Sequence, residues 1–228
     1  MKKTLIELVE TYQEQGYLHL KSYVSKEIID QLKHVCCSIL DLPLCSSELG
    51  GVHESHSKSV NRYFSRTHNP VGLDCVITSL LTQLQLLPLL KNVCGGEIQL
   101  DSDFTILSWL PEHIQKGFTG FHQDGPDDFY EEGFPHVWIP IEDDRDVNMR
   151  VIPKSHIFGN FPHGMFGQFV KVLPKFSDPF MDVEKDLKVE VGDLLVFSTR
   201  LLHCLTLNYS NQTCWSLEFM CKRKEEIK

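Results

Sequence analysis

Seven short runs rich in β-branched, aromatic and other apolar residues follow one another along the chain, with turn residues between them. They cover residues 104–110, 118–122, 137–141, 150–152, 187–191, 194–198 and 214–220. Short strands at such intervals are typical of a β-sandwich or a jelly roll. We therefore expect residues 98–222 to form a β core, which restricts the chain to few architectures.

The N-terminal residues predict helices beside this core. Apolar residues recur with helical spacing between Leu5 and Tyr12, and Gly16 is suited to end a helix there. Residues 17–20 then predict a short strand. Ser25 is expected to cap a second helix, because a serine side chain can accept a hydrogen bond from the first helical turn.

A leucine-rich stretch at residues 73–92 predicts a third helix, which Pro88 should kink or end. Residues 41–72 are rich in Ser, Gly, His and Asn and predict an irregular loop region. The chain shows no internal repeat. We therefore expect one mostly β domain over residues 1–228, in which residues 1–97 form a mainly helical flank.

Composition argues against several classes of protein. The net charge is −9, and basic residues cluster only at Lys222-Arg223-Lys224, so we expect no nucleic-acid partner. No apolar run approaches the length of a transmembrane helix, so we expect no membrane partner. The eight cysteines include no Cys-x-x-Cys pair, which indicates reduced thiols in a cytoplasmic protein.

The sequence His122-Gln123-Asp124 has the spacing of a metal site on extended backbone. Side chains alternate between the two faces of a strand, so His122 and Asp124 point the same way while Gln123 points away. A third ligand must come from elsewhere, and His203 is the candidate. Two imidazoles and one carboxylate on one face of a metal ion are typical of non-haem iron(II), with positions left open for substrate or oxygen.

Further motifs occur in a fixed order on both sides of these residues. They are Tyr12–Leu20, Ser25-Lys26-Glu27, Phe121-His122-Gln123-Asp124, Val137–Ile141, Ile152-Pro153-Lys154-Ser155-His156, and Gly192-Asp193 followed by Leu202-His203. Over nearly its whole length the chain thereby resembles the phytanoyl-CoA dioxygenase family of Fe(II)/2-oxoglutarate-dependent oxygenases. The resemblance implies a double-stranded β-helix, the cupin-like jelly roll.

The resemblance also implies roles for residues. His122, Asp124 and His203 become the catalytic iron ligands, and 2-oxoglutarate becomes the cosubstrate. The implied reaction is hydroxylation of an unactivated C–H bond of a small molecule with O2.

The chain departs from the family at Cys214. Family members usually carry an Arg there, whose guanidinium binds the far carboxylate of 2-oxoglutarate, and a thiol cannot form that paired contact. Three alternatives stay open. Another base, Lys116, Arg150 or Arg200, reaches the same pocket; or a metal-dependent jelly-roll enzyme works without 2-oxoglutarate; or the protein binds metal and ligand without turnover.

Other polar residues have simpler interpretations. His156 is expected to fix a turn by hydrogen bonding, and His136 and His163 are interpreted as surface residues. Asp127-Asp128 is interpreted first as a solvated turn. Because this acidic pair follows the His122-Gln123-Asp124 segment closely, the alternative is that it selects an amine-bearing substrate. The sequence does not determine the oligomeric state.

Overall fold

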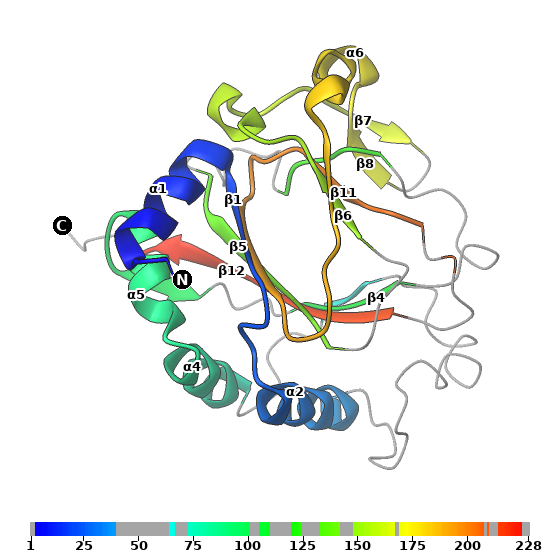
Figure 1. The fold of residues 1–228 in the computed structure, drawn as a ribbon. Helices are drawn as coiled ribbons and strands as arrows, with labels where there is room; N and C mark the ends of the chain where they lie inside the picture. The colour runs from blue at the N-terminus through cyan, green and yellow to red at the C-terminus, as the bar shows by residue number, and fades with distance from the viewer. Residues whose placement is uncertain are drawn as a thin grey trace.

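A large antiparallel sheet runs through the centre of the molecule (Figure 1). The computed structural model describes residues 3–39, 64–66, 73–100, 105–109, 120–124, 133–141, 148–166, 169–207, 209 and 214–224. Within them the sheet has the order β1 (Tyr17–Leu20), β10 (Leu194–Ser198), β5 (Pro135–Pro140), β12 (Cys214–Arg223), β4 (Thr105–Trp109) and β2 (Phe64–Arg66), and β3 (Ile98–Leu100) also pairs with β12.

A second antiparallel sheet faces the first. Its strands are β11 (His203–Leu205), β6 (Met149–Val151) and β9 (Lys185–Leu187). Apolar residues of both sheets form one buried cluster, with Trp138 and Phe197 from the large sheet and Val151 from the second. Two facing antiparallel sheets around a shared core form a jelly roll.

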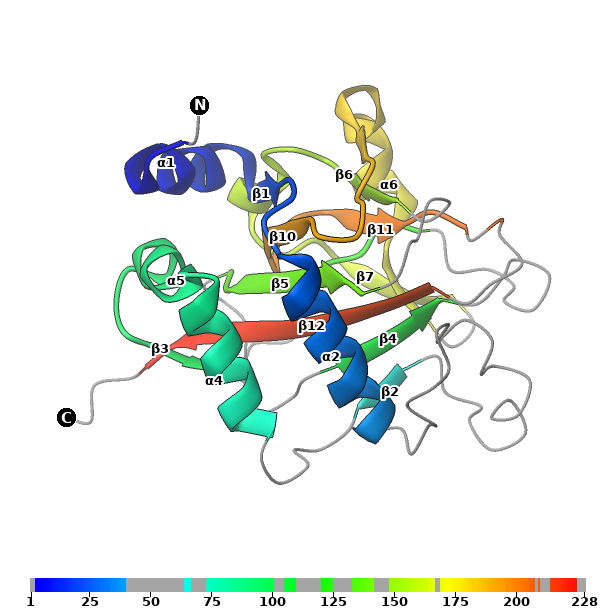
Figure 2. The ribbon, with the colours of Figure 1, turned by 60° about the horizontal axis from the view of Figure 1, so that its bottom comes forward.

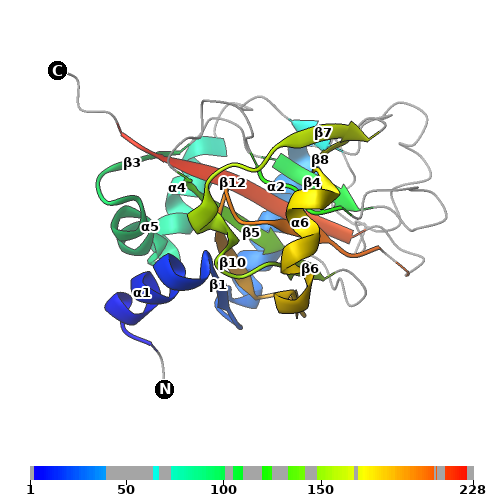
Figure 3. The ribbon, with the colours of Figure 1, turned by 90° about the horizontal axis from the view of Figure 1, so that it is seen from above.

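The segment 120–124 extends the second sheet at its β11 edge. His122 forms a β-bridge with His203, and the backbone N–H of Val172 donates to the carbonyl of Phe121 at 2.9 Å. Val172 ends the hairpin of β7 (His163–Phe166) and β8 (Phe169–Val172). Figure 3 shows this hairpin and α6 (Pro174–Ser177) at the end of the molecule away from the N-terminal helix.

Helices cover the outer face of the large sheet (Figure 2). They are α1 (Leu5–Gln15), α2 (Lys26–Ile39), α4 (Leu73–Gln83) and α5 (Leu86–Cys94). Their apolar faces pack on Val137, Ile139 and Phe219 of the sheet in a single cluster. Among the residues described, no helix combines the length and the apolar character needed to cross a membrane.

Alternation along β5 decides which side chains face the interior. Val137 and Ile139 point to the helices, whereas Trp138 packs in the cluster between the two sheets. His136 shares the inner face with Trp138, since the two lie two residues apart on one strand.

Local signals explain the helix ends. Gly16 ends α1 with a left-handed φ of 83°, and its N–H donates to the carbonyl of Tyr12 at 2.7 Å. The Ser25 hydroxyl accepts from the N–H of Ile28 at 3.4 Å, as predicted. The predicted third helix is divided at Gln85 into α4 and α5, because Pro88 has no N–H and its ring would clash with the carbonyl of Leu84.

The strand predicted at 187–191 is wrong in position. The strand β9 covers Lys185–Leu187, and the following residues turn instead. Asp193 closes that turn, because its side chain accepts from the N–H of Glu190 at 3.2 Å and its own N–H donates to the Glu190 carbonyl at 2.9 Å. A backbone engaged in this turn is not available for pairing with a neighbouring strand.

Short paired segments were missed elsewhere. The strand β2 lies in the region predicted to be irregular, and the hairpin β7–β8 was not predicted at all. The predicted strand 118–122 is described only from residue 120, where it forms the single bridge at His122. Segments of three or four residues carry too little periodicity to be recognised in a sequence.

Candidate metal centre

His122 and His203 face each other across the join between segment 120–124 and β11. The two residues exchange both backbone hydrogen bonds, from His122 N to His203 O at 3.0 Å and from His203 N to His122 O at 3.1 Å. Directly paired residues present their side chains on one face, and the two imidazole centroids lie 4.2 Å apart. The fold therefore holds two histidines, about 80 residues apart in the chain, side by side.

Asp124 completes the group, and its backbone N–H is held by the carbonyl of Thr199 at 2.9 Å. Its Oδ1 lies 3.5 Å from Nε2 of His122, and its Oδ2 lies 3.4 Å from Nε2 of His203. One donor atom from each of the three residues lies within 4.8 Å of the others, which suits a shared metal ion. The structure brings together the three residues predicted to bind a metal.

Gln123 points away from this group, as predicted. Its side chain is buried, its Nε2 donates to the carbonyls of Gly159 and Arg200, and its Oε1 accepts from the N–H of Phe161 at 2.7 Å. These bonds hold the backbone between His122 and Asp124, so Gln123 fixes the orientation of both neighbours.

The donor atoms suit a divalent cation. Nδ1 of His203 lies 2.9 Å from the carbonyl of Leu201 and can donate to it, so Nε2, which faces Asp124, is the nitrogen placed to bind a metal ion. Burial, followed by the proximity of His203, lowers the pKa of His122 to about 3. Burial alone would raise the pKa of Asp124, but His203 and His136 hold it well below its usual range.

As metal ligands, these three residues would offer two imidazole nitrogens and one carboxylate. Metal ligands must be deprotonated, and this set of donors fits iron(II). The side chains of His122, Asp124 and His203 retain 18%, 21% and 5% exposure, so the site is sheltered but still reachable.

His136 belongs to the site although it was interpreted as a surface residue. Its side chain on β5 is buried, and its Nδ1 lies 2.6 Å from Oδ2 of Asp124. Its Nε2 lies 3.6 Å from a carboxylate oxygen of Glu218 on β12. Burial alone would lower the pKa of His136, but Asp124 and then Glu218 outweigh burial and raise it to about 10.

A signal for His136 was present in the sequence. It lies two residues before Trp138, so the alternation that places Trp138 in the core places His136 on the same inner face. The predicted strand begins at Val137 and therefore leaves His136 out. The contact with Glu218 depends on the pairing of β5 with β12, which the sequence alone does not specify.

Cys214 lies at the start of β12 and is buried in the cluster between the sheets. Trp138, Phe197 and Leu195 belong to the same cluster, so Cys214 has apolar neighbours in the core. A thiol at this position cannot form the paired contact with a carboxylate that an Arg would form.

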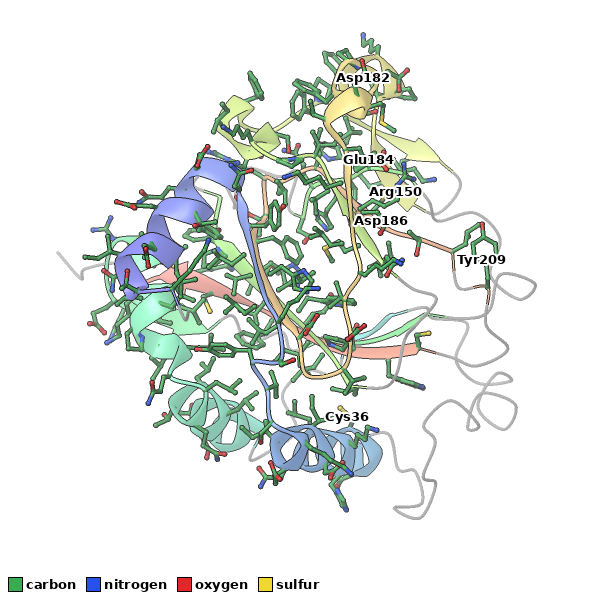
Figure 4. The ribbon with its side chains drawn as sticks, viewed as in Figure 1. Cys36, Arg150, Asp182, Glu184, Asp186 and Tyr209 are labelled. Atoms are coloured by element: carbon green, nitrogen blue, oxygen red, sulfur yellow. The ribbon has the colours of Figure 1, made fainter. Side chains whose placement is uncertain are left out.

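Arg150 is not brought to the candidate metal centre. Val151 pairs with His203 and shares its face, so Arg150 points to the opposite face of the second sheet. There it forms an ion pair with Glu184 (Figure 4). Its guanidinium carbon lies 5.5 Å from the ring centroid of Phe121. The charge of Arg150 is thus compensated by Glu184 on the outer face of the second sheet.

Arg200 follows β10 beside the site. Its carbonyl accepts from Gln123, and the stem of its side chain lies against Gly133. Its Nε is buried and has no hydrogen-bond partner among the described residues. The other predicted positions, Lys116 and Asp127-Asp128, lie outside the described residues.

His156 fixes its turn by hydrogen bonding, as predicted, whereas His163 differs from its interpretation as a surface residue. Nε2 of His156 lies 3.1 Å from the carbonyl of Gln13, so this side chain ties its turn to the end of α1. His163 lies on β7 and is half-buried, and its proximity contributes to the low pKa of His122. His163 is therefore not a fully exposed surface residue.

Solved structures, but no family model and no curated protein, match the chain. One is the epimerase SnoN, with a TM-score of 0.65 at 16% identity over 96% of this chain and 83% of that one. EctD from S. alaskensis has a TM-score of 0.66 at 13% identity over 95% and 75%. AviO1 from Streptomyces viridochromogenes Tue57 has 0.64 at 12% over 100% and 99%. This likeness confirms the predicted jelly-roll fold.

Proposed function

We propose that the protein is a non-haem iron(II) oxygenase that uses 2-oxoglutarate and O2 to oxidise a small molecule. The observation that carries this proposal is the convergence of His122, Asp124 and His203 on the inner face of a jelly roll. Two structural neighbours support the cofactors. SnoN is described in complex with Fe3+ and alpha ketoglutarate, and EctD with 2-oxoglutarate and 5-hydroxyectoine.

The chain's own residues have defined parts in this function. His122, Asp124 and His203 would hold iron(II) and leave its remaining positions open. Iron(II) with 2-oxoglutarate and O2 supplies the oxidising power needed to break an unactivated C–H bond. Phe197 packs against His203 and belongs to one apolar cluster with Trp138, which would shield this side of the site from water.

Hydroxylation and membership of the phytanoyl-CoA dioxygenase family are the finer parts of the proposal. They are supported by the ordered motifs and by Asp124 as a carboxylate ligand. The neighbours include an epimerase and a carbocyclase, so a jelly roll of this kind supports other outcomes too. We also propose a cytoplasmic protein in which residues 1–228 form one oxygenase domain, with an amine-bearing substrate selected by Asp127-Asp128.

The far carboxylate of 2-oxoglutarate needs a cation that Cys214 does not provide. Of the candidate cations, Arg200 is supported because its Nε is buried and has no hydrogen-bond partner among the described residues. Lys116 is supported by its position shortly before His122 and Asp124 in the sequence. Cys214 packs among apolar residues and cannot bind a carboxylate as an Arg would, which favours a second candidate function, a metal-dependent jelly-roll enzyme that works without 2-oxoglutarate. A metal- and ligand-binding protein without turnover remains the third alternative.

An anaerobic titration separates these functions. The protein is loaded with iron(II) and then titrated with 2-oxoglutarate while the visible spectrum is recorded. We expect the metal-to-ligand charge-transfer band of a chelated 2-oxo acid, and its absence from His122→Ala. Loss of the band in Arg200→Met but not in Arg150→Met would identify Arg200 as the carboxylate partner.

Two further outcomes of this titration would each support one of the alternative functions. A protein that binds iron(II) but gives no band at saturating 2-oxoglutarate contradicts the use of this cosubstrate. A band without succinate formation, measured after O2 is admitted with no added substrate and then with candidate amines, supports binding without turnover.

A further inference from the structure

We infer that His136, held in place by Glu218, is a positioning residue that fixes the carboxylate of Asp124 for metal binding through one oxygen. This inference rests on the proposed metal centre and deepens it. No feature of the His122-Gln123-Asp124 motif indicates such a residue. It follows from the arrangement of β5 and β12 around the site.

The contact between His136 and Asp124 engages one carboxylate oxygen. Nδ1 of His136 lies 2.6 Å from Oδ2 of Asp124, and this is the shortest contact that Oδ2 makes among the described residues. Oδ1 lies 3.5 Å from Nε2 of His122. A hydrogen bond donated to Oδ2 leaves Oδ1 as the stronger donor for a metal and opposes rotation of the carboxylate.

The ring of His136 is itself held from two sides. Phe197 is paired directly with His136 across β10 and β5, and their ring centroids lie 4.7 Å apart. Glu218 is paired with Trp138, the next inner-face residue, so it reaches His136 diagonally. With its Nε2 3.6 Å from Glu218, His136 is oriented so that Nδ1 faces Asp124.

This arrangement has a chemical consequence. A carboxylate bound through one oxygen occupies one position of the metal, whereas a carboxylate free to turn can bind through two and close a position. The positioning of Asp124 by His136 therefore keeps metal positions open for a chelating cosubstrate. Partners of metal ligands of this kind contribute about 10–100-fold to metal affinity.

Two amide variants of His136 separate its two contacts. In His136→Asn the side-chain nitrogen lies close to the position of Nδ1 and can still donate to Asp124. In His136→Gln it lies close to the position of Nε2 and can reach Glu218 but not Asp124. We propose to titrate wild type and both variants anaerobically with cobalt(II), whose visible ligand-field bands report both affinity and coordination.

We expect His136→Gln to weaken cobalt(II) binding by about 10–100-fold and to change the shape of the bands. His136→Asn should keep both close to wild type, a rescue that a merely structural role would not give. Circular dichroism of the metal-free variants checks folding. If His136→Gln does not fold, Glu218→Ala replaces it as the test variant. It leaves the contact atoms of His136 and Asp124 in place and should also weaken cobalt(II) binding.

The outcomes are distinguishable. If wild type binds cobalt(II) and His136→Gln binds equally well, or if His136→Asn is as weak as His136→Gln, the positioning role is overturned while the proposed function stands. If wild type binds no cobalt(II) or iron(II), the proposed function and this inference both fail.

Discussion

At the scale of single residues, the candidate metal centre depends on what lies between its ligands. Gln123 faces away from His122 and Asp124 and bonds three backbone groups from two other segments. It is buried, so loss of its amide would leave those groups without partners in the interior. Leaving buried polar groups without hydrogen bonds costs free energy, so Gln123 contributes both to the stability of the fold and to the orientation of the metal ligands.

We predict that Gln123→Leu lowers the free energy of unfolding by about 2–4 kcal/mol. Urea denaturation of the metal-free protein measures this change. Gln99→Leu is the matched control, because Gln99 is exposed on β3 and should change stability by no more than about 0.5 kcal/mol. Equal stability of the two variants would contradict the role assigned to Gln123.

Part of the site was accessible from the sequence, and the physical reason is the two-residue period of extended backbone. That period placed His122 and Asp124 together and Gln123 opposite, and His203 was found by resemblance. His136 and Glu218 were not predicted, because their contact depends on which strands are neighbours. The position of Arg150 in the chain made it a candidate to bind the far carboxylate of 2-oxoglutarate. The alternation of side chains along β6 places it on the outer face of the second sheet instead.

At the scale of elements, the join between α1 and β1 is a tightly constrained turn. Gly16 has a φ of 83°, and a Cβ there would overlap the ring of His156 and lie 2.9 Å from Leu201. Its carbonyl also accepts from the N–H of Ser198 at 2.9 Å. The turn therefore holds the helix, β10 and the His156 turn together.

We predict that Gly16→Ala lowers the free energy of unfolding by about 3 kcal/mol or more, since it adds steric overlap to backbone strain. The chain offers a matched control in Gly95→Ala, where φ is 70° but no atom lies within 4 Å of the added Cβ. That control should cost about 1–2 kcal/mol from backbone strain alone. Thermal unfolding of both variants measures the difference, and a Gly16→Ala change no larger than the control would refute the packing argument.

The elements that were predicted well have strong local causes. β10 was placed with its observed bounds because an apolar run follows the Gly192-Asp193 turn, and α1 ends where Gly16 permits. β9 was misplaced because Asp193 draws residues 190–193 into a turn. β7 and β8 stabilise each other mainly by pairing, so neither segment alone has a sequence pattern that predicts a strand.

At the scale of the whole molecule, the cysteine side chains that the structure describes lie in several parts of the core and form no disulfide. The cysteines whose side chains the structure describes form no disulfide, and Cys36, Cys204, Cys214 and Cys221 are buried. Figure 4 labels Cys36 on α2, at the helical side of the large sheet. Cys94 is half-buried, and burial raises the pKa of its thiol to about 11, against the opposing effect of Arg223.

Because only the thiolate reacts with iodoacetamide, Cys94 of the native protein should be alkylated about 100-fold more slowly at pH 8 than the same thiol in the unfolded chain. Its rate should rise about tenfold per pH unit up to about pH 10, as the thiolate fraction grows. Peptide mass spectrometry follows the reaction at each cysteine. A rate that levels off near pH 9 would show that Cys94 is not shielded as described.

The metal content of the protein tests the central claim most directly. Wild type and the variants His122→Ala, Asp124→Ala and His203→Ala are dialysed anaerobically against iron(II), and bound iron is measured. We predict about one iron per wild-type chain and less than about a tenth of that in each folded variant, since three ligands on one face hold the ion. Iron retained at the wild-type level by any of the three variants, or no iron in wild type, would contradict the account.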